Sequence, residues 1–153
     1  MKLSESEENY IKCIYHLHVP GQGVSATLLA ASVQTKAASV TEMLKRLSRK
    51  KLINYKPYHN FTLTELGNKI ALEVIRKHRL WEYFLVEKLG FDWHEVHTIA
   101  EELEHISSKE LIHRLEAFLG SPSFDPHGDP IPDRFGKMKT VRQTCLSEIP
   151  EKK

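Results

Sequence analysis

Potential metal-ligating side chains recur at helical spacing between His97 and His105, in the sequence HTIAEELEH. Glu101 follows His97 at i+4, and the adjacent pair Glu104 and His105 follows at i+7 and i+8. At about 100° per residue, these four side chains are expected to share one face of a helix. Carboxylate oxygens together with imidazole nitrogens suit Mn, Fe and Zn. The spacing therefore predicts a site for a divalent first-row metal.

A second pair, His78 and Glu82, repeats the i, i+4 geometry in an earlier segment. Each motif alone has an ordinary explanation. An acidic helix face with histidines is often a solvated surface, and a His–Glu pair is often an exposed contact worth a few tenths of a kcal/mol. Two such motifs in one chain favour metal binding.

Charge is distributed unevenly along the 153 residues, although the formal net charge is only +2. Residues 36–59 contain seven Lys or Arg and one acidic residue, whereas residues 92–119 contain seven Asp or Glu and two basic residues. The asymmetry predicts that the first region meets a polyanion and the second holds cations.

Neither targeting signals nor disulfide patterns are evident. The two cysteines form no CxxC motif, and Met1 leads into a charged segment. No apolar run reaches the roughly 18–20 residues that span a bilayer. These features predict a cytoplasmic protein without a membrane partner.

The first 65 residues read as three helices and a hairpin. A helix running to about His18 is followed by a short helix capped by Ser25 and a third helix over residues 37–51, whose apolar positions follow i, i+3, i+4, i+7. Two alternating segments, 52–55 and 61–64, then predict a β-hairpin. This order is the plan of a winged helix–turn–helix domain that binds double-stranded DNA.

The third helix and the hairpin supply the expected DNA contacts. Hydroxyl residues lie near the start of that helix, and basic residues that include Lys50 lie near its end, where they can neutralise phosphates. The ordinary alternative is a solvated basic face. The predicted DNA-binding residues are Lys36, Ala38, Ser39, Thr41, Glu42, Lys45, Arg46, Arg49, Lys56 and His59.

The second half of the chain is predicted to be helical. Thr64 is expected to cap a helix through about Lys88, Asp92 to cap the helix with the ligands, and Ser107 or Ser108 to cap a last helix. Beyond residue 120 the chain is rich in Pro and Gly, as in an ordered loop or a linker.

Aromatic residues are numerous in this half. Trp81, Phe84, Phe91 and Trp93 offer more aromatic surface than one small helical layer buries, so a homodimer is expected. The predicted fold class is mainly α, with a winged helix–turn–helix domain over residues 1–64, an all-helical metal-binding and dimerisation domain over 65–121, and a loop and tail over 122–153.

Six segments resemble the diphtheria toxin repressor family of metal-dependent transcriptional regulators, whose smaller branch includes the manganese transport regulator. They are ENYIKCIYHL, VQTKAASVTEMLKRL, LTELGNKIA, RKHRLWEYFL, VHTIAEELEH and DPHGDPIP. The resemblance implies a dimeric repressor of metal-uptake genes that binds a palindromic operator, with Mn(II) or Fe(II) as the favoured corepressor and Zn(II) as an alternative.

The resemblance also implies two metal sites. The primary site corresponds to Asn9, Glu101, Glu104 and His105, and the ancillary site corresponds to His78, Glu82 and His97. This chain departs from the family pattern in three places. Asn9 stands where members commonly have Met or Asp, Lys12 where the manganese branch has Glu, and Glu101 where iron-type members have Cys. A carboxylate at position 101 favours a harder ion such as Mn(II).

Two alternatives and one further resemblance accompany this prediction. A metal-dependent hydrolase is a rival reading, but the chain lacks HExxH, and catalysis does not explain the basic helix, so no enzyme is expected. The second alternative is a winged-helix regulator that acts without metal. Residues 144–150, TCLSEIP, resemble the start of the small β-barrel domain that longer members carry.

Overall fold

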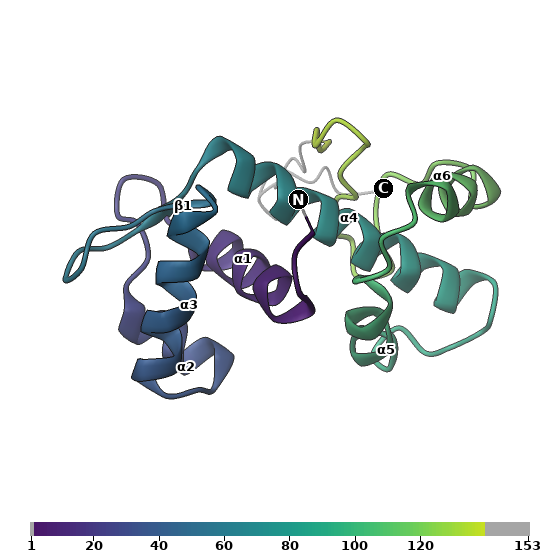
Figure 1. Ribbon diagram of the computed structural model, residues 1–153. Coiled ribbons are helices and arrows are strands. Elements are labelled where there is room, and N and C mark those ends of the chain that lie inside the picture. Colours follow the sequence, from purple (N-terminus) through teal and green to yellow (C-terminus); the bar gives the residue numbers. More distant parts are fainter. Residues whose placement is uncertain (1, 140–153) are drawn as a thin grey trace, which may run out of the picture.

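A computed structural model describes residues 2–139, and the TCLSEIP segment lies outside these described residues. Figure 1 shows an N-terminal half that contains the hairpin and a helical C-terminal half, joined by one long helix. This mainly α architecture with a winged helix confirms the predicted fold class. The elements are α1 (Glu5–Leu17), α2 (Ala26–Val33), α3 (Ala37–Arg49), β1 (Ile53–Asn54), β2 (Thr62–Leu63), α4 (Glu65–Glu87), α5 (Val96–Leu103) and α6 (Lys109–Phe118).

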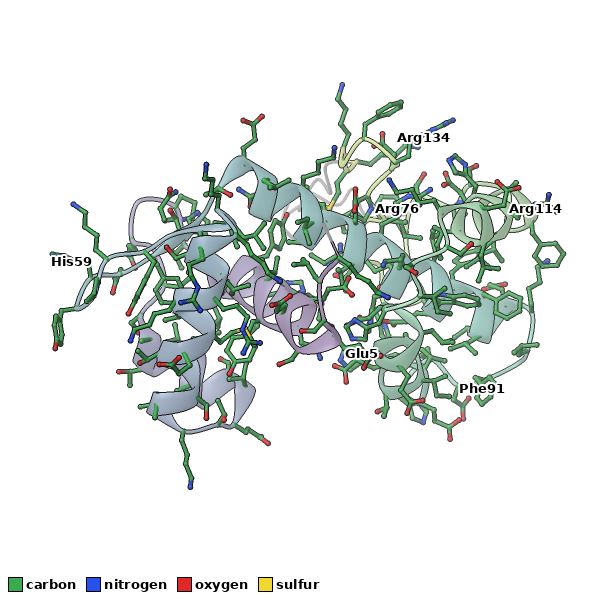
Figure 2. All side chains as sticks on the ribbon, viewed as in Figure 1. Glu5, His59, Arg76, Phe91, Arg114 and Arg134 are labelled. Carbon is green, nitrogen blue, oxygen red and sulfur yellow. The ribbon has the colours of Figure 1, made fainter. Side chains whose placement is uncertain are left out.

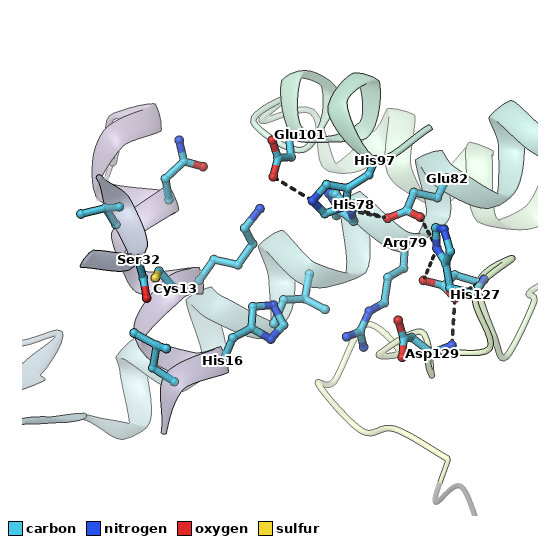
Figure 3. A pocket seen from close by; sticks show the side chains of 16 residues that line it. Cys13, His16, Ser32, His78, Arg79, Glu82, His97, Glu101, His127 and Asp129 are labelled. Atoms are coloured by element: carbon cyan, nitrogen blue, oxygen red, sulfur yellow. Dashed lines mark hydrogen bonds and ion pairs between the residues drawn. The ribbon is translucent and has the colours of Figure 1, made fainter. Parts of the chain in front are cut away.

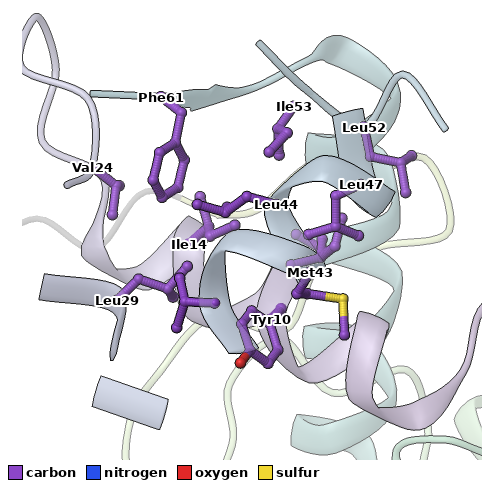
Figure 4. Packing of buried hydrophobic residues seen from close by; sticks show 13 residues of the cluster. Tyr10, Ile14, Val24, Leu29, Met43, Leu44, Leu47, Leu52, Ile53 and Phe61 are labelled. Atoms are coloured by element: carbon purple, nitrogen blue, oxygen red, sulfur yellow. The ribbon is translucent and has the colours of Figure 1, made fainter. Parts of the chain in front are cut away.

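Short polar caps fix the helices of the N-terminal half. Ser4 and Glu7 form a reciprocal capping box on α1, and Ser25 accepts a hydrogen bond from the backbone of Leu28 at the start of α2. The apolar faces of α1, α2 and α3 then meet in one core, which Figure 4 shows around Leu44 and Phe61. This shared core fixes the orientation of α3 and therefore of its outward face.

The wing is a short antiparallel hairpin. Ile53 pairs with Leu63 and Asn54 with Thr62, so its strands are shorter than the alternating pattern predicts. An isolated bridge between Val24 and Phe61 ties the chain before α2 to the base of the wing. Thus the wing is held to the helix–turn–helix by backbone hydrogen bonds.

Helix α4 connects the two halves of the molecule. Its 23 residues give it a length of about 35 Å. Thr64 caps it, as predicted, by accepting a hydrogen bond from the backbone of Gly67. A Cβ at position 67 would clash with the carbonyl oxygen of Leu52, so glycine allows α4 to approach the hairpin closely. The opposite end of α4 packs on α5 and α6.

The C-terminal half has its own core of residues from α4, α5, α6 and the following segment. Trp81 lies in this core and Phe84 packs against it, whereas Phe91 and Trp93 are exposed. A bridge between Phe124 and Pro130 folds the Pro/Gly-rich segment on itself, and Arg79 of α4 donates a hydrogen bond to the carbonyl of Pro130. The four aromatic residues are thus divided between core and surface.

One of the predicted helix caps is wrong. Helix α5 has Glu95 at its N-cap with no side-chain cap, and the backbone carbonyl of Asp92 accepts a hydrogen bond from the backbone of Glu95 in the preceding turn. Ser108 caps α6, in agreement with the sequence. None of the helices within residues 2–139 is long and apolar enough to cross a membrane.

Candidate metal centre and nucleic-acid interface

His78 lies at the centre of a buried polar cluster between α4 and α5. Its Nδ1 is 2.7 Å from Oε2 of Glu104, and its Nε2 contacts Oε1 of Glu82. The same Nε2 lies 3.1 Å from Nδ1 of His97. His78 and Glu82 are 7% and 2% exposed, so the helix buries both polar groups within the protein. Figure 3 shows this cluster at one wall of a cavity of about 640 Å3.

The electrostatics of the cluster favour a cation. Burial alone would lower the pKa of His78, but hydrogen bonds to Glu104 and Glu82 raise it above its ordinary value. Burial alone would raise the pKa of Glu82 and of Glu104, but His78 lowers both. The two carboxylates are therefore ionised on either side of one imidazole, and either a proton or a metal ion can supply the positive charge.

A second histidine approaches the other oxygen of Glu82. Nε2 of His127 is 2.7 Å from the carbonyl oxygen of Trp93, and its Nδ1 is 2.7 Å from Oε2 of Glu82. If Nε2–H donates to that carbonyl, a neutral ring turns the Nδ1 lone pair toward the carboxylate. Glu82 Oε2 is also buried without a hydrogen-bond donor in the part of the chain described. A cation between the two atoms satisfies both, and ligating histidines commonly donate their other N–H to a carbonyl.

The loop after α6 holds a further carboxylate beside His127. Asp125 Oδ1 accepts hydrogen bonds from the backbone of His127, at 2.9 Å, and of Asp129, at 2.8 Å, which leaves Oδ2 3.8 Å from His127 Nδ1. Burial raises the pKa of Asp125. Two groups of three residues in this region each bring their potential ligand atoms within 4.8 Å of one another. One group is His78, Glu82 and His97, and the other is Glu82, Asp125 and His127.

The structure does not gather His97, Glu101, Glu104 and His105 into one compact ligand group among the described residues, although His97 and Glu104 both contact His78. Glu104, the C-cap of α5, keeps helical dihedral angles and has a fully buried side chain. In contrast, the side chains of His97 and Glu101 are 62% and 49% exposed and pair with each other at 2.9 Å. The four residues therefore differ in exposure: Glu104 is buried against Lys12 and His78, whereas Glu101 lines the cavity.

Glu104 and His105 instead meet side chains of α1. The Glu104 carboxylate accepts a 2.6 Å hydrogen bond from Lys12 Nζ, and His105 Nδ1 lies 3.4 Å from Glu8 Oε1. Asn9 is exposed and lines the cavity with Glu101. The predicted primary ligands therefore surround the junction of α1 and α5 without forming one compact group among the described residues.

The outward face of α3 and the wing form the candidate DNA surface. Nine of the ten predicted DNA-binding residues are exposed, and Thr41 is half-buried with its hydroxyl donating to the carbonyl of Ala37. Lys50, in contrast, donates to both oxygens of the buried Glu7, at 2.8 and 2.9 Å. Its ammonium group therefore stabilises the fold of this half, where the sequence suggested a phosphate contact.

The sequence matches two domain models that adjoin along the chain. Residues 2–60 match the iron dependent repressor N-terminal DNA binding domain, and residues 64–133 match the iron dependent repressor metal binding and dimerisation domain. The chain belongs to the iron-dependent repressor family. The predicted resemblance to this family is confirmed.

Relatives of the chain include both iron- and manganese-dependent proteins. The iron-dependent repressor IdeR of Mycobacterium tuberculosis is 34% identical over 131 residues, which cover 86% of this chain and 57% of that protein. An HTH-type transcriptional regulator of Methanocaldococcus jannaschii is 37% identical over 118 residues, 76% of this chain and 94% of that one. The structure of a manganese-dependent transcriptional repressor in complex with manganese has a TM-score of 0.81 at 37% identity, covering 95% and 67% of the two chains.

The chain thus matches little more than half the length of IdeR. Within the family, the structure adds residues to the candidate sites that the spacing of His and Glu did not single out. Glu8 and Lys12 face Glu104 and His105, Asp125 and His127 face Glu82, and Tyr58 is fully exposed at the tip of the wing. The family segment DPHGDPIP contains both Asp125 and His127, so the signal was present in the sequence.

Proposed function

We propose that this chain is a metal-activated transcriptional repressor that acts as a homodimer on double-stranded DNA. Family membership supports this function, as do a basic surface on α3 and a carboxylate–imidazole cluster at the other end of the molecule. The observation that carries it is the buried Glu82 carboxylate, which has histidine nitrogens at both oxygens. Regulation of metal-uptake genes in the cytoplasm is the setting we propose.

The ancillary site comprises His78, Glu82 and His97 in this proposal, and we add Asp125 and His127 on the second oxygen of Glu82. All five side chains offer oxygen or nitrogen donors, which suit Mn(II), Fe(II) and Zn(II). Ligands from α4, α5 and the loop after α6 are already oriented by hydrogen bonds. When bound, the metal supplies positive charge that ties these three elements together.

The primary site comprises Asn9, Glu101, Glu104 and His105 in the same proposal. Binding there requires Lys12 to release the Glu104 carboxylate, because the ammonium group lies 2.6 Å from Oε1. Since Lys12 and Asn9 belong to α1 and Glu104 follows α5, the exchange of ammonium for metal changes the contact between the two halves. A metal ion shifts their arrangement only by its differential affinity for the two states.

The DNA-binding surface of this repressor comprises residues 36–49 of α3 and its preceding turn, with Lys56 and His59 on the wing. A two-fold symmetric dimer is expected to select a palindromic operator whose half-sites are separated by whole helical turns. The exposed Phe91 and Trp93 are available for the dimer contact. We propose that the DNA-binding domain ends at residue 64 and that the metal-binding and dimerisation domain begins at residue 65, where α4 starts.

Operator binding tests this proposal directly. Sites are selected from random duplex DNA in the presence of Mn(II), and the affinity of the selected site is then measured with Mn(II), Fe(II), Zn(II) and a chelator. The expected result is a palindromic site that is bound at least several-fold more tightly with metal. Equal affinity with metal and with chelator favours the metal-independent regulator, and protection of a single half-site counts against the dimer.

A further inference from the structure

A second cavity lies on the opposite side of α4 from His78 and Glu82. At about 100° per residue, Glu73 and Arg76 fall roughly opposite those two ligands on the helix, and Lys77 lies on the flank between the two sides. This cavity has a volume of about 260 Å3 and lies between α4, the residues that connect α5 to α6, the first turns of α6, and Arg134. None of the candidate metal or DNA-binding residues lines it.

The walls of this cavity are strongly basic. Arg76, Lys77, Lys109 and Arg134 line it with His113, against a single carboxylate from Glu73. The hydroxyl-bearing Ser107 and Ser108 lie at its edge, where α6 begins. Four cationic side chains around one small cavity favour a negatively charged ligand, and the positive end of the α6 dipole adds to this preference.

Arg76 gives the cavity a buried donor. Its residue is 8% exposed, and its Nη2 forms an ion pair with Glu116, but its Nε is buried without a hydrogen-bond partner among residues 2–139. Burial and the nearby charge of Arg134 lower the pKa of the Arg76 guanidinium. A buried N–H of a charged group left unpaired is costly, and an anion in the cavity can accept from it while offsetting the charge of Arg134. Figure 2 shows the two arginines labelled near one another.

We propose that this cavity binds a phosphate oxyanion, either free or at the end of a small phosphorylated molecule. Guanidinium groups match phosphate oxygens in geometry as well as charge, and the cavity offers two of them, with lysine ammonium groups beside them. The exposed apolar side chains of α6, Leu111 and Phe118, lie on the helix face roughly opposite Lys109 and His113. A partner that covers those apolar residues therefore leaves the cavity accessible.

Calorimetric titration of the metal-free full chain with inorganic phosphate tests this proposal, at constant ionic strength in chloride with a chelator present. Saturable binding of one phosphate per chain is expected. Arg134→Ala is expected to weaken it about tenfold or more, the scale of one lost charge-assisted hydrogen bond. Arg114→Ala is the matched control, because Arg114 is an exposed arginine of α6 outside the cavity and is expected to leave the affinity unchanged.

Arg76→Gln is expected to abolish phosphate binding, provided that the variant still unfolds cooperatively. If Arg76→Gln does not fold, the phosphate affinity of Arg134→Ala tests the proposal alone. A parallel titration with glycerol phosphate identifies the source of the anion: tighter binding than inorganic phosphate indicates a phosphate ester, and weaker binding indicates the free ion. Absence of saturable phosphate binding, or equal affinities of Arg134→Ala and Arg114→Ala, overturns the proposal.

Discussion

Glu82 and Glu104 lie on two sides of the same imidazole, and their surroundings differ in how the negative charge is compensated. Glu82 faces three histidines, and when His127 is neutral with its proton on Nε2, the Oε2 atom of Glu82 has no hydrogen-bond donor among the described residues. Glu104 is equally buried but already holds the ammonium group of Lys12. The first carboxylate is therefore prepared for a metal ion, whereas the second must first lose a cation that the chain itself supplies.

The difference explains how one cluster can both hold a metal and report it. A site whose ligands are already oriented binds without rearrangement, because little ordering remains to be done on binding. A site that exchanges Lys12 for metal changes the contact between α1 and the helical half. We infer that the Glu82 side favours affinity and the Glu104 side favours coupling to DNA.

The largest expected effect is on metal affinity when Glu82 is changed. Glu82→Gln keeps the size of the side chain but removes the charge shared by both candidate ligand groups. We expect Mn(II) affinity to fall by at least about 100-fold. This loss exceeds that caused by removing a residue that only hydrogen-bonds to a metal ligand. Competition with a metal-binding dye measures the affinity. Glu102→Gln, at an exposed position of α5, is the matched control, and an equal loss in both variants would remove the basis for the Glu82 site.

The next effect concerns coupling through Glu104. Glu104→Ala is expected to abolish metal-stimulated operator binding, a loss of about 5–150-fold in affinity, or 1–3 kcal/mol. The fold should persist, which circular dichroism and the cooperativity of unfolding check. Because the substitution leaves Lys12 without its partner, the double variant with Lys12→Met separates this cost from the loss of the ligand. Full metal stimulation in both variants contradicts a primary site at Glu104.

Removal of Lys12 alone is expected to increase metal affinity. Lys12→Gln removes the ammonium group that competes for the Glu104 carboxylate, so Mn(II) affinity at this site should rise by about tenfold, the scale of one charge-assisted hydrogen bond. The metal-free protein should lose stability, since a buried carboxylate loses its cation. Thermal unfolding with and without Mn(II) measures both quantities. An unchanged metal affinity would indicate that Lys12 and the metal do not compete.

Metal affinity is also expected to depend on pH. The raised pKa of His78 means that this imidazole is still protonated above the ordinary histidine range, and the metal must displace that proton. Affinity should therefore fall as the pH decreases, and the fall should begin above about pH 6.5. The lowered pKa values of Glu82 and Glu104 keep both carboxylates ionised through this interval. Calorimetry in two buffers of different ionisation enthalpy counts the protons released, and binding without proton release is the contrary result.

The smallest effects concern the DNA surface. Arg49→Ala is expected to weaken operator binding uniformly across sequences and to reduce the slope of its salt dependence by about 1. Lys50→Ala, one residue away, should instead lower the free energy of unfolding, because Lys50 pairs with the buried Glu7. Salt-dependent DNA titrations and urea unfolding of the two variants check the pair. If both variants behave alike in both assays, the assignment of Arg49 to DNA binding and of Lys50 to fold stability is incorrect.

Much of the fold could be predicted from local patterns. The periodicity of α3 and the caps Ser25 and Thr64 identified real helices, because capping and one-sided burial are local properties that neighbouring residues determine. The cap at Asp92 was wrong because α5 begins at Val96, after a turn closed by the backbone carbonyl of Asp92, which sequence spacing does not distinguish from the start of a helix. The strands of the wing were shorter than their alternating pattern.

The site was less predictable than the fold, since it depends on which distant segments pack against α5. Helical spacing placed Glu104 near Glu101, but it did not show that Glu104 is buried against His78 and Lys12 while Glu101 stays exposed. His127 reaches Glu82 from a loop 45 residues later, where no periodicity relates the two positions. The metal assignments at both sites remain predictions that ligand-bound measurements can test.

Anomalous scattering at the manganese edge, from crystals grown with Mn(II), tests most directly whether Glu82 is the prepared ligand of this family member. We expect an ion about 2.0–2.3 Å from a Glu82 oxygen, with nitrogen from His78, His97 or His127 in the same coordination sphere. Ordered manganese elsewhere in the molecule, with Glu82 still paired only to uncoordinated histidines at saturating metal, would contradict it.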